Sequence, residues 1–160
     1  MERHYIDPFI TSAVKIIRKT TGLTAFKKNI YVRKGKLSLG GVGIILGIGG
    51  DIVGRVAYEF SRSVTIQLAS KMISRSSVTL DDKDNFIKLL KSTISELGNL
   101  ISGHAITHLL QMGYNCKITP PKTYIGQGVT LVPDRFVTFV IELQTECGDF
   151  VINLALEMNN

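Results

Sequence analysis

The sequence lacks the residue patterns that mark most metal, nucleotide and redox sites. It has only two cysteines, Cys116 and Cys147, and their spacing matches no metal or redox motif. No Gly-Lys-Ser or Gly-Lys-Thr phosphate loop is present, and the glycines from Gly41 to Gly47 have one residue too many for a dinucleotide-binding fingerprint. Charge and Pro8 interrupt the N-terminus before an apolar run that could serve as a signal peptide. We therefore expect free thiols in a reducing compartment, with a disulfide left open.

Tryptophan is absent, and aromatic residues make up only 8% of the chain. The formal net charge of +6 comes entirely from residues 1–36, where nine basic and two acidic residues give +7, while the remainder gives −1. Such an excess suits an acidic protein surface, nucleic acid or anionic lipid, or a solvated edge that keeps the protein soluble. Because few aromatic residues interleave with the basic ones, a base-stacking site is poorly supported and we expect no nucleic-acid partner.

A long apolar run without interruption is also missing. The segment 37–58 has about the length of a membrane span, but it contains Asp51, Arg55 and seven glycines. A strand hairpin explains these glycines better, so we expect a cytoplasmic protein without stable membrane insertion. With 160 residues, of which 44% are hydrophobic and 20% charged, the chain suits a single domain over residues 1–160.

The hydrophobic periodicity predicts an α+β fold with the element order α-β-β-β-α-α-β-β-β. Helices are expected over residues 6–20, 61–74 and 82–112. Strands are expected over residues 29–39, 42–48, 52–60, 124–125 with 129–132, 136–144 and 150–158. Runs of strands and helices in this order favour an antiparallel β-sheet with helices packed on one face.

The long third helix has a sharply divided surface. With Glu96 placed at 0° and about 100° per residue, its apolar residues fall between about 100° and 220°; they are Ile87, Leu90, Ile94, Leu97, Ile101, Ala105 and Leu109. Ser92, Glu96, Asn99 and Gly103 fall on the opposite side, between about 300° and 0°. A carboxylate and a carboxamide one turn apart therefore point together at solvent.

Two glycines interrupt this helix, and each costs about 1 kcal/mol relative to alanine. Gly98 lies at the edge of the packed side, where close helix contact would explain it. Gly103 lies on the solvent side, has no internal packing reason and would let a partner approach the backbone. His104 and His108 are four residues apart on the packed side without a third ligand, so we expect a hydrogen-bonded structural role rather than a metal site.

The run from Ser95 to Ala105, SELGNLISGHA, resembles the helix motif of the CheC/CheX/FliY family of bacterial chemotaxis phosphatases. The segment 118–126 with Pro120 and Pro121 resembles the strand entry that follows this helix, and the segment 42–61 resembles the glycine-rich hairpin before it. The similarity extends from about residue 5 to residue 157. The single Glu-x-x-Asn copy is similar to the CheX branch, which implies a CheC-like fold.

This resemblance implies a chemotaxis hydrolase, a protein phosphatase that dephosphorylates the phospho-aspartate of a CheY-type response regulator in two-component signalling. Asn99 would position the hydrolytic water, and Glu96 would pair with a lysine of the regulator. The expected partner-binding residues are Ser92, Ser95, Leu100 and Gly103. The chain would need no metal or cofactor of its own, because Mg²⁺ is expected in the partner regulator. The family resemblance also implies a homodimer.

Two alternatives remain open at this point. The chain could be a non-catalytic CheX-like module that docks a response regulator or a motor or receptor component. The intact Glu96 and Asn99 pair favours hydrolysis, because a pure docking domain has no need of the amide. The basic N-terminal third could instead bind nucleic acid or a membrane, which retention on heparin or anionic vesicles would reveal.

Overall fold

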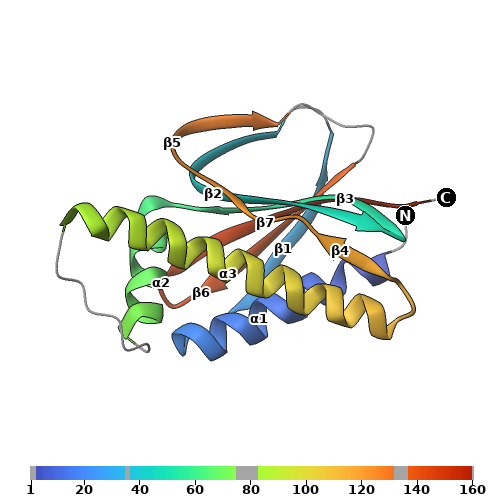
Figure 1. The fold of residues 1–160 in the computed structure, drawn as a ribbon, viewed down its shortest axis with the longest axis horizontal. Coiled ribbons are helices and arrows are strands. Elements are labelled where there is room, and N and C mark those ends of the chain that lie inside the picture. The colour runs from blue at the N-terminus through green and yellow to red at the C-terminus, as the bar shows by residue number, and fades with distance from the viewer. Residues whose placement is uncertain (1–2, 35–36, 75–82, 132–136, 160) are drawn as a thin grey trace.

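A computed structural model describes residues 3–34, 37–74, 83–131 and 137–159. After a short 3-10 turn at Arg3–Tyr5, the elements follow in the order α1 (Asp7–Thr21), β1 (Phe26–Arg33), β2 (Leu37–Gly50), β3 (Ile52–Phe60), α2 (Arg62–Ser74), α3 (Lys83–Gln111), β4 (Cys116–Ile118), β5 (Lys122–Leu131), β6 (Thr138–Thr145) and β7 (Gly148–Met158) (Figure 1). The predicted order is confirmed, with β4 as one additional short strand.

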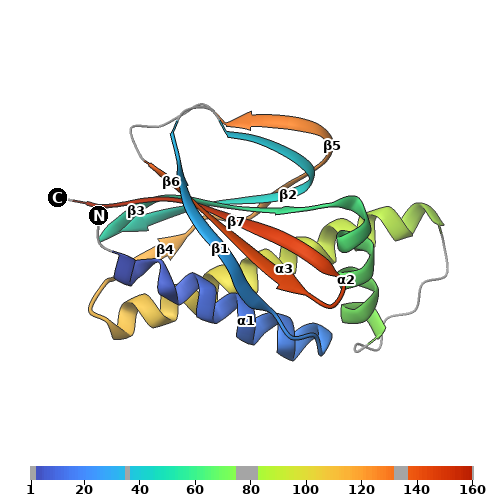
Figure 2. The ribbon, with the colours of Figure 1, turned by 180° about the vertical axis from the view of Figure 1, so that it is seen from behind.

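All of these strands belong to one antiparallel sheet with the order β1-β6-β7-β3-β2-β4, and β5 pairs with β2. The three α-helices cover one face of the sheet, as Figures 1 and 2 show from opposite sides. The paired ends of β2 and β5 curl away from the helices, and Leu39 of β2 packs there against Ala57 of β3. The predicted α+β class with helices on one face is therefore confirmed.

The strand boundaries differ from the prediction in three places. The expected single strand over residues 29–39 is wrong, because β1 ends at Arg33 and a separate strand, β2, begins at Leu37. The segments 124–125 and 129–132 belong to one strand, β5, up to Leu131. Strand β4 was not predicted, because three residues are too few to show an alternating pattern and the strand forms by pairing with the end of β2.

Local sequence explains the helix boundaries. Pro8 lies in the first turn of α1, and Gly22 ends that helix with a φ of 78°. Ser61 caps α2, because its Oγ accepts a hydrogen bond of 3.1 Å from the backbone N–H of Val64.

Gly113 terminates α3, which ends at Gln111, well ahead of Pro120 and Pro121. It has a φ of 96°, and its N–H donates to the carbonyl of Leu110 at 3.0 Å. The N–H of Tyr114 donates to the carbonyl of Leu109 at 2.9 Å, which completes a Schellman motif.

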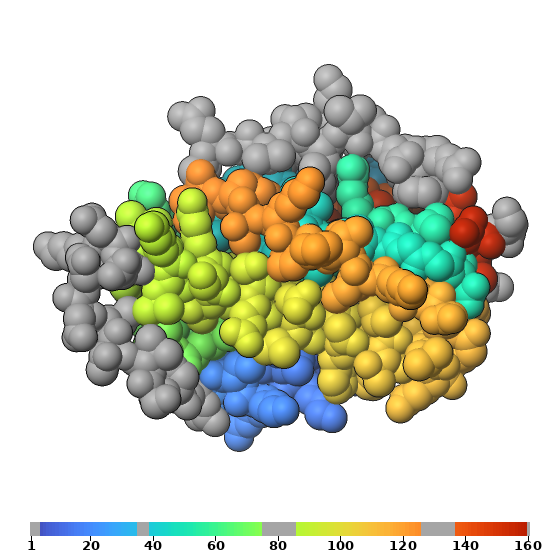
Figure 3. All heavy atoms as spheres, in the orientation of Figure 1, coloured from blue at the N-terminus to red at the C-terminus, as the bar shows by residue number. Residues whose placement is uncertain are grey.

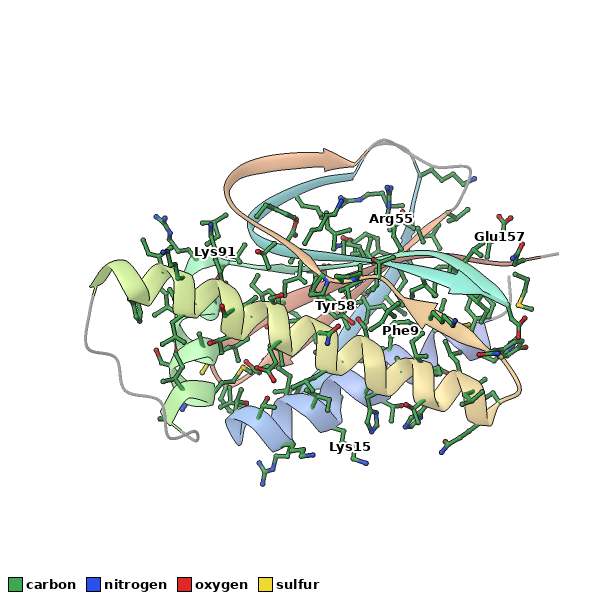
Figure 4. The ribbon with its side chains drawn as sticks, viewed as in Figure 1. Phe9, Lys15, Arg55, Tyr58, Lys91 and Glu157 are labelled. Carbon is green, nitrogen blue, oxygen red and sulfur yellow. The ribbon has the colours of Figure 1, made fainter. Side chains whose placement is uncertain are left out.

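The hydrophobic core lies between the sheet and the helices. Figure 4 shows Phe9 of α1 and Tyr58 of β3 in this layer, and both side chains are fully buried. Tyr58 Oη lies 2.7 Å from Ser102 Oγ, so a buried hydrogen bond joins β3 to α3. Burial raises the pKa of Tyr58 far above its usual value, so the phenol stays protonated and can keep this bond.

Among the described helices we find none whose length and apolar content would let it cross a membrane. Cys116 in β4 is buried and Cys147 in the β6–β7 turn is half-buried, and both are free thiols, as predicted.

We predict unequal effects of removing the two hydroxyls of the Tyr58–Ser102 pair. Ser102→Ala leaves the phenol of Tyr58 buried without a partner and should lower the free energy of unfolding by about 1–3 kcal/mol. Tyr58→Phe should cost less, because the hydroxyl of Ser102 can turn to the carbonyl one helical turn earlier. Urea denaturation of both variants and of the double variant measures this. The double variant should be more stable than Ser102→Ala, because it lacks the unpartnered phenol. Equal and additive losses of unfolding free energy would contradict this prediction.

Candidate functional site

Helix α3 runs across one face of the molecule with α1 beside it, as the space-filling view in Figure 3 shows. Glu96 and Asn99, one turn apart on this helix, are both exposed. Within the described ranges, neither side chain is engaged in a hydrogen bond or an ion pair. The predicted pair therefore points outward with its carboxylate and amide available to another molecule.

The packed side of α3 determines this orientation. A Cβ added at Gly98 would lie 2.9 Å from Cγ2 of Ile44, so only glycine lets the helix approach β2 this closely. One turn later, Ser102 is bonded to Tyr58. These two contacts fix which side of α3 faces the sheet. The predicted packing role of Gly98 is confirmed.

The other predicted site residues lie on or near the exposed face. A Cβ added at Gly103 would have no heavy atom within 4 Å, so this glycine has no internal packing reason, as predicted. Ser92 is exposed, Ser95 is half-buried, and Leu100 is 37% exposed. The structure thus brings these residues together on one helix surface, while their roles in binding and catalysis stay predictions.

A hollow beside Glu96 involves residues that the sequence pattern did not connect to this face. Glu96 and Leu100 line an open hollow of about 320 Å³ together with Lys19 and Thr20 of α1 and Met72 of α2. The four-residue spacing of Lys15 and Lys19 indicated that both lysines lie on one side of their helix. That spacing could not be used without knowing that α1 packs beside α3.

His104 joins α3 to α1 at the end of this face. Its Nδ1 lies 3.0 Å from Oγ of Ser12, and its ring centre lies 4.8 Å from that of His108. Partial burial lowers the pKa of His104 below its usual value, and the charges of His108, Lys15 and Lys19 lower it further. The predicted hydrogen-bonded role is confirmed for His104. In the portion of the chain that the structure describes, no three His, Cys, Asp or Glu side chains gather to hold a metal ion.

A second pocket, of about 300 Å³, includes neither Glu96 nor Asn99. It lies where α2, the first turns of α3 and the strands β2 and β5 meet, and Lys91 at its border is labelled in Figure 4. Its lining consists of Val42, Arg62, Thr65, Ile66, Phe86, Ile87, Leu90, Lys91 and Ile125. This lining contains no carboxylate, imidazole or thiol, and its polar groups are the hydroxyl of Thr65 and the cationic side chains of Arg62 and Lys91.

The two glycines of α3 should respond oppositely to alanine. In Gly98→Ala the new methyl group would crowd Ile44, and overpacking typically costs about 1–3 kcal/mol, more than the gain in helix propensity. Gly103→Ala meets open space and should raise stability by up to about 1 kcal/mol. Thermal and urea unfolding of both variants measure this difference. A stabilised Gly98→Ala or an unfolded Gly103→Ala would show that the face of α3 is misassigned.

Comparisons with known proteins show which family the chain is similar to. The family described as chemotaxis phosphatase CheX matches residues 42–144. The chain is 30% identical over 87 residues to the CheY-P phosphatase CheX of Thermotoga maritima, and the alignment covers 54% of this chain and 53% of that protein. The chain thus spans about half the length of this curated relative.

Solved structures share the fold over nearly the whole chain. The chemotaxis protein CheX of Desulfovibrio desulfuricans is 23% identical with a TM-score of 0.82, covering 97% of this chain and 99% of that one. The structure of the CheX–CheY–BeF₃–Mg²⁺ complex from Borrelia burgdorferi matches with 23% identity and a TM-score of 0.74, covering 98% and 99%. Because the family match extends over most of the chain and includes Glu96 and Asn99, the chain belongs to the chemotaxis phosphatase CheX family.

Proposed function

We propose that this chain is a phosphatase that hydrolyses the phospho-aspartate of a CheY-type response regulator. The observation that carries the proposal is the outward-facing Glu96 and Asn99 pair on α3, in a member of the CheX family. The Thermotoga maritima relative is named a CheY-P phosphatase, and the Borrelia burgdorferi relative was solved with CheY, BeF₃ and Mg²⁺. Those names describe those proteins and support the same class of partner here.

The chemistry requires little from the phosphatase itself. Water attacks the phosphorus of the acyl phosphate, the bond to the aspartate oxygen breaks, and inorganic phosphate and a free carboxylate result. Catalysis then depends mainly on positioning the water in line with the breaking bond. The carboxamide of Asn99 suits this task, because its oxygen can accept a hydrogen bond from the water while its NH₂ donates to a phosphoryl oxygen.

Glu96 has a different role in this proposal. A carboxylate placed directly against a phosphoryl group would be repelled by it, so Glu96 pairs with the lysine of the regulator and fixes its approach. Mg²⁺ belongs to the regulator, and this chain contributes no metal or cofactor. Ser92, Ser95, Leu100 and Gly103 form the surrounding contact surface.

Localisation in the cytoplasm and assembly into a homodimer also belong to this proposal. The localisation rests on the sequence pattern of the N-terminus and of residues 37–58, and the dimer rests on the family resemblance. Sedimentation analysis of the purified protein tests the dimer.

Replacing Asn99 by alanine should remove catalysis without unfolding the protein, because the side chain is exposed and unbonded. We expect the rate of stimulated phosphate release to fall by about 100-fold or more, as for loss of one preorganised hydrogen-bond donor. The measurement is phosphate release from a phosphorylated CheY-type regulator. Asn115→Ala, at an exposed asparagine outside this face, is the matched control. Full activity of folded Asn99→Ala would exclude the water-positioning role. A wild-type protein that binds the regulator without accelerating hydrolysis would support the non-catalytic docking module instead.

Glu96 variants should weaken docking in the order Gln, Ala, Lys. Glu96→Gln keeps the shape and loses the charge, whereas Glu96→Lys sets two like charges against each other. Truncating one member of a tight interfacial charge pair typically costs about 2 kcal/mol or more, so calorimetric titration with the phosphorylated regulator should resolve the series. Unchanged affinity in Glu96→Lys would exclude the pairing.

A further inference from the structure

Helix α1 places part of the basic N-terminal charge beside the Glu96 and Asn99 face. Figures 1 and 2 show α1 and α3 running antiparallel in the helix layer, and the contact between Ser12 and His104 joins them. From Ser12, Lys19 lies about 10 Å further along α1 at 1.5 Å per residue, and from His104, Glu96 lies about 12 Å back along α3. Lys19 is therefore level with Glu96, which agrees with the hollow that both residues line.

The lysines of α1 are available at this position. Lys15 and Lys19 are exposed one turn apart, and within the described chain neither takes part in an ion pair. Figure 4 shows Lys15 extending from α1 away from the sheet. Both charges reach His104, since they contribute to the lowered pKa of that side chain. Arg18 differs, because its guanidinium donates to the carbonyl of Gly22 at 3.0 Å and so turns to the end of α1.

Three further basic residues of the N-terminal third lie elsewhere. Lys27, Lys28 and Arg33 belong to β1, which Figure 2 brings to the front while α3 lies behind. Lys28 is paired with Asp149 at 2.8 Å. Among these described residues, the structure thus separates an edge-strand group from the α1 group of Lys15 and Lys19, and it is the α1 group that borders the face of α3.

We infer that Lys15 and Lys19 form the border of the docking surface on α3 and attract the acidic groups that surround the phosphoryl group of the response regulator. The inference rests on the proposed function. A phosphoryl group and the carboxylates that hold Mg²⁺ beside it make that part of the regulator negative. Glu96 is matched to the regulator's lysine at contact and gives no attraction to these acidic groups. Lys19, which shares the hollow with Glu96, and Lys15, one turn earlier on α1, supply this attraction. Charges at the border of an interface act mainly on the association rate and on its salt dependence.

The test is the double charge reversal Lys15→Glu with Lys19→Glu. At low ionic strength we expect kcat/KM for phosphate release to fall about tenfold while kcat at saturating regulator is unchanged. The loss should shrink in about 0.5 M salt, where exposed charges are screened over a few ångströms. Lys15→Gln with Lys19→Gln should show a smaller loss. Lys27→Glu with Lys34→Glu is the matched control, because it makes the same change in net charge at exposed residues in and just after β1.

Each outcome decides between this inference and the proposed function. An equal loss in the control pair, or a loss that salt does not reduce, overturns the assignment of the two lysines. If the wild type is active, Asn99→Ala is inactive and the reversed pair matches the wild type, only the lysine inference fails. If the wild type binds the regulator without hydrolysing it, the catalytic proposal fails and the ratio of affinities between wild type and reversed pair decides about the lysines. If the wild type neither binds nor hydrolyses, both fail.

A separate measurement distinguishes the other acidic partners. Heparin and vesicles of phosphatidylglycerol with phosphatidylcholine are offered to the wild type and the reversed pair in moderate salt. Retention of the wild type that is lost in the reversed pair, without any effect on the regulator assay, would assign the lysines to nucleic acid or membrane and overturn the inference. Equal behaviour of the two proteins in this assay supports it.

Discussion

The close packing of α3 on β2 at Gly98 is the constraint on which the functional surface depends. A side chain at this position would meet Ile44, so the helix can lie this near to the sheet only with glycine there. The hydrogen bond between Ser102 and Tyr58 holds the same side of the helix one turn later. Together they fix the rotation of α3 about its axis. Because 3.6 residues complete a turn, fixing the buried side also fixes which residues face solvent, and Glu96 and Asn99 take that side.

This arrangement explains which parts of the site could be predicted. Helical periodicity is a local property, so the sequence alone separated Gly98 from Gly103 and placed Glu96 beside Asn99. The position of α1 is not local, because the contact between Ser12 and His104 joins residues 92 positions apart. No periodic pattern within either helix specifies that partner. The hollow that Lys19 shares with Glu96 therefore became visible only in the folded chain.

The same distinction applies to the strands and to the N-terminal charge. Long apolar segments such as β7 were predicted nearly to their ends, whereas β4 exists through its pairing with Gly50 and its neighbours in β2. As a run of sequence, residues 1–36 form one basic block. In the fold, Lys27 and Lys28 lie on an exposed edge strand, where lysines discourage pairing with other chains, and Lys15 and Lys19 lie on a helix next to the candidate site. The basic residues of this one block therefore have two different physical roles.

A helix face is a suitable platform for the proposed reaction because the partner carries most of the chemistry. The acyl phosphate is reactive, and the regulator contributes the metal ion, so the phosphatase needs neither a deep pocket nor a nucleophile. This is consistent with the largely apolar pocket between α2 and the first turns of α3, which includes neither Glu96 nor Asn99. The phosphatase must hold one amide at a defined place. Because the other side of α3 is packed against the sheet, the backbone of Asn99 is already ordered and little conformational entropy is lost when the partner binds. Gly103, on the next turn, adds no side chain that would keep the partner from reaching Asn99. Gly98, which packs against the sheet, and Gly103, which faces outward, thus both help to present Asn99 to the partner.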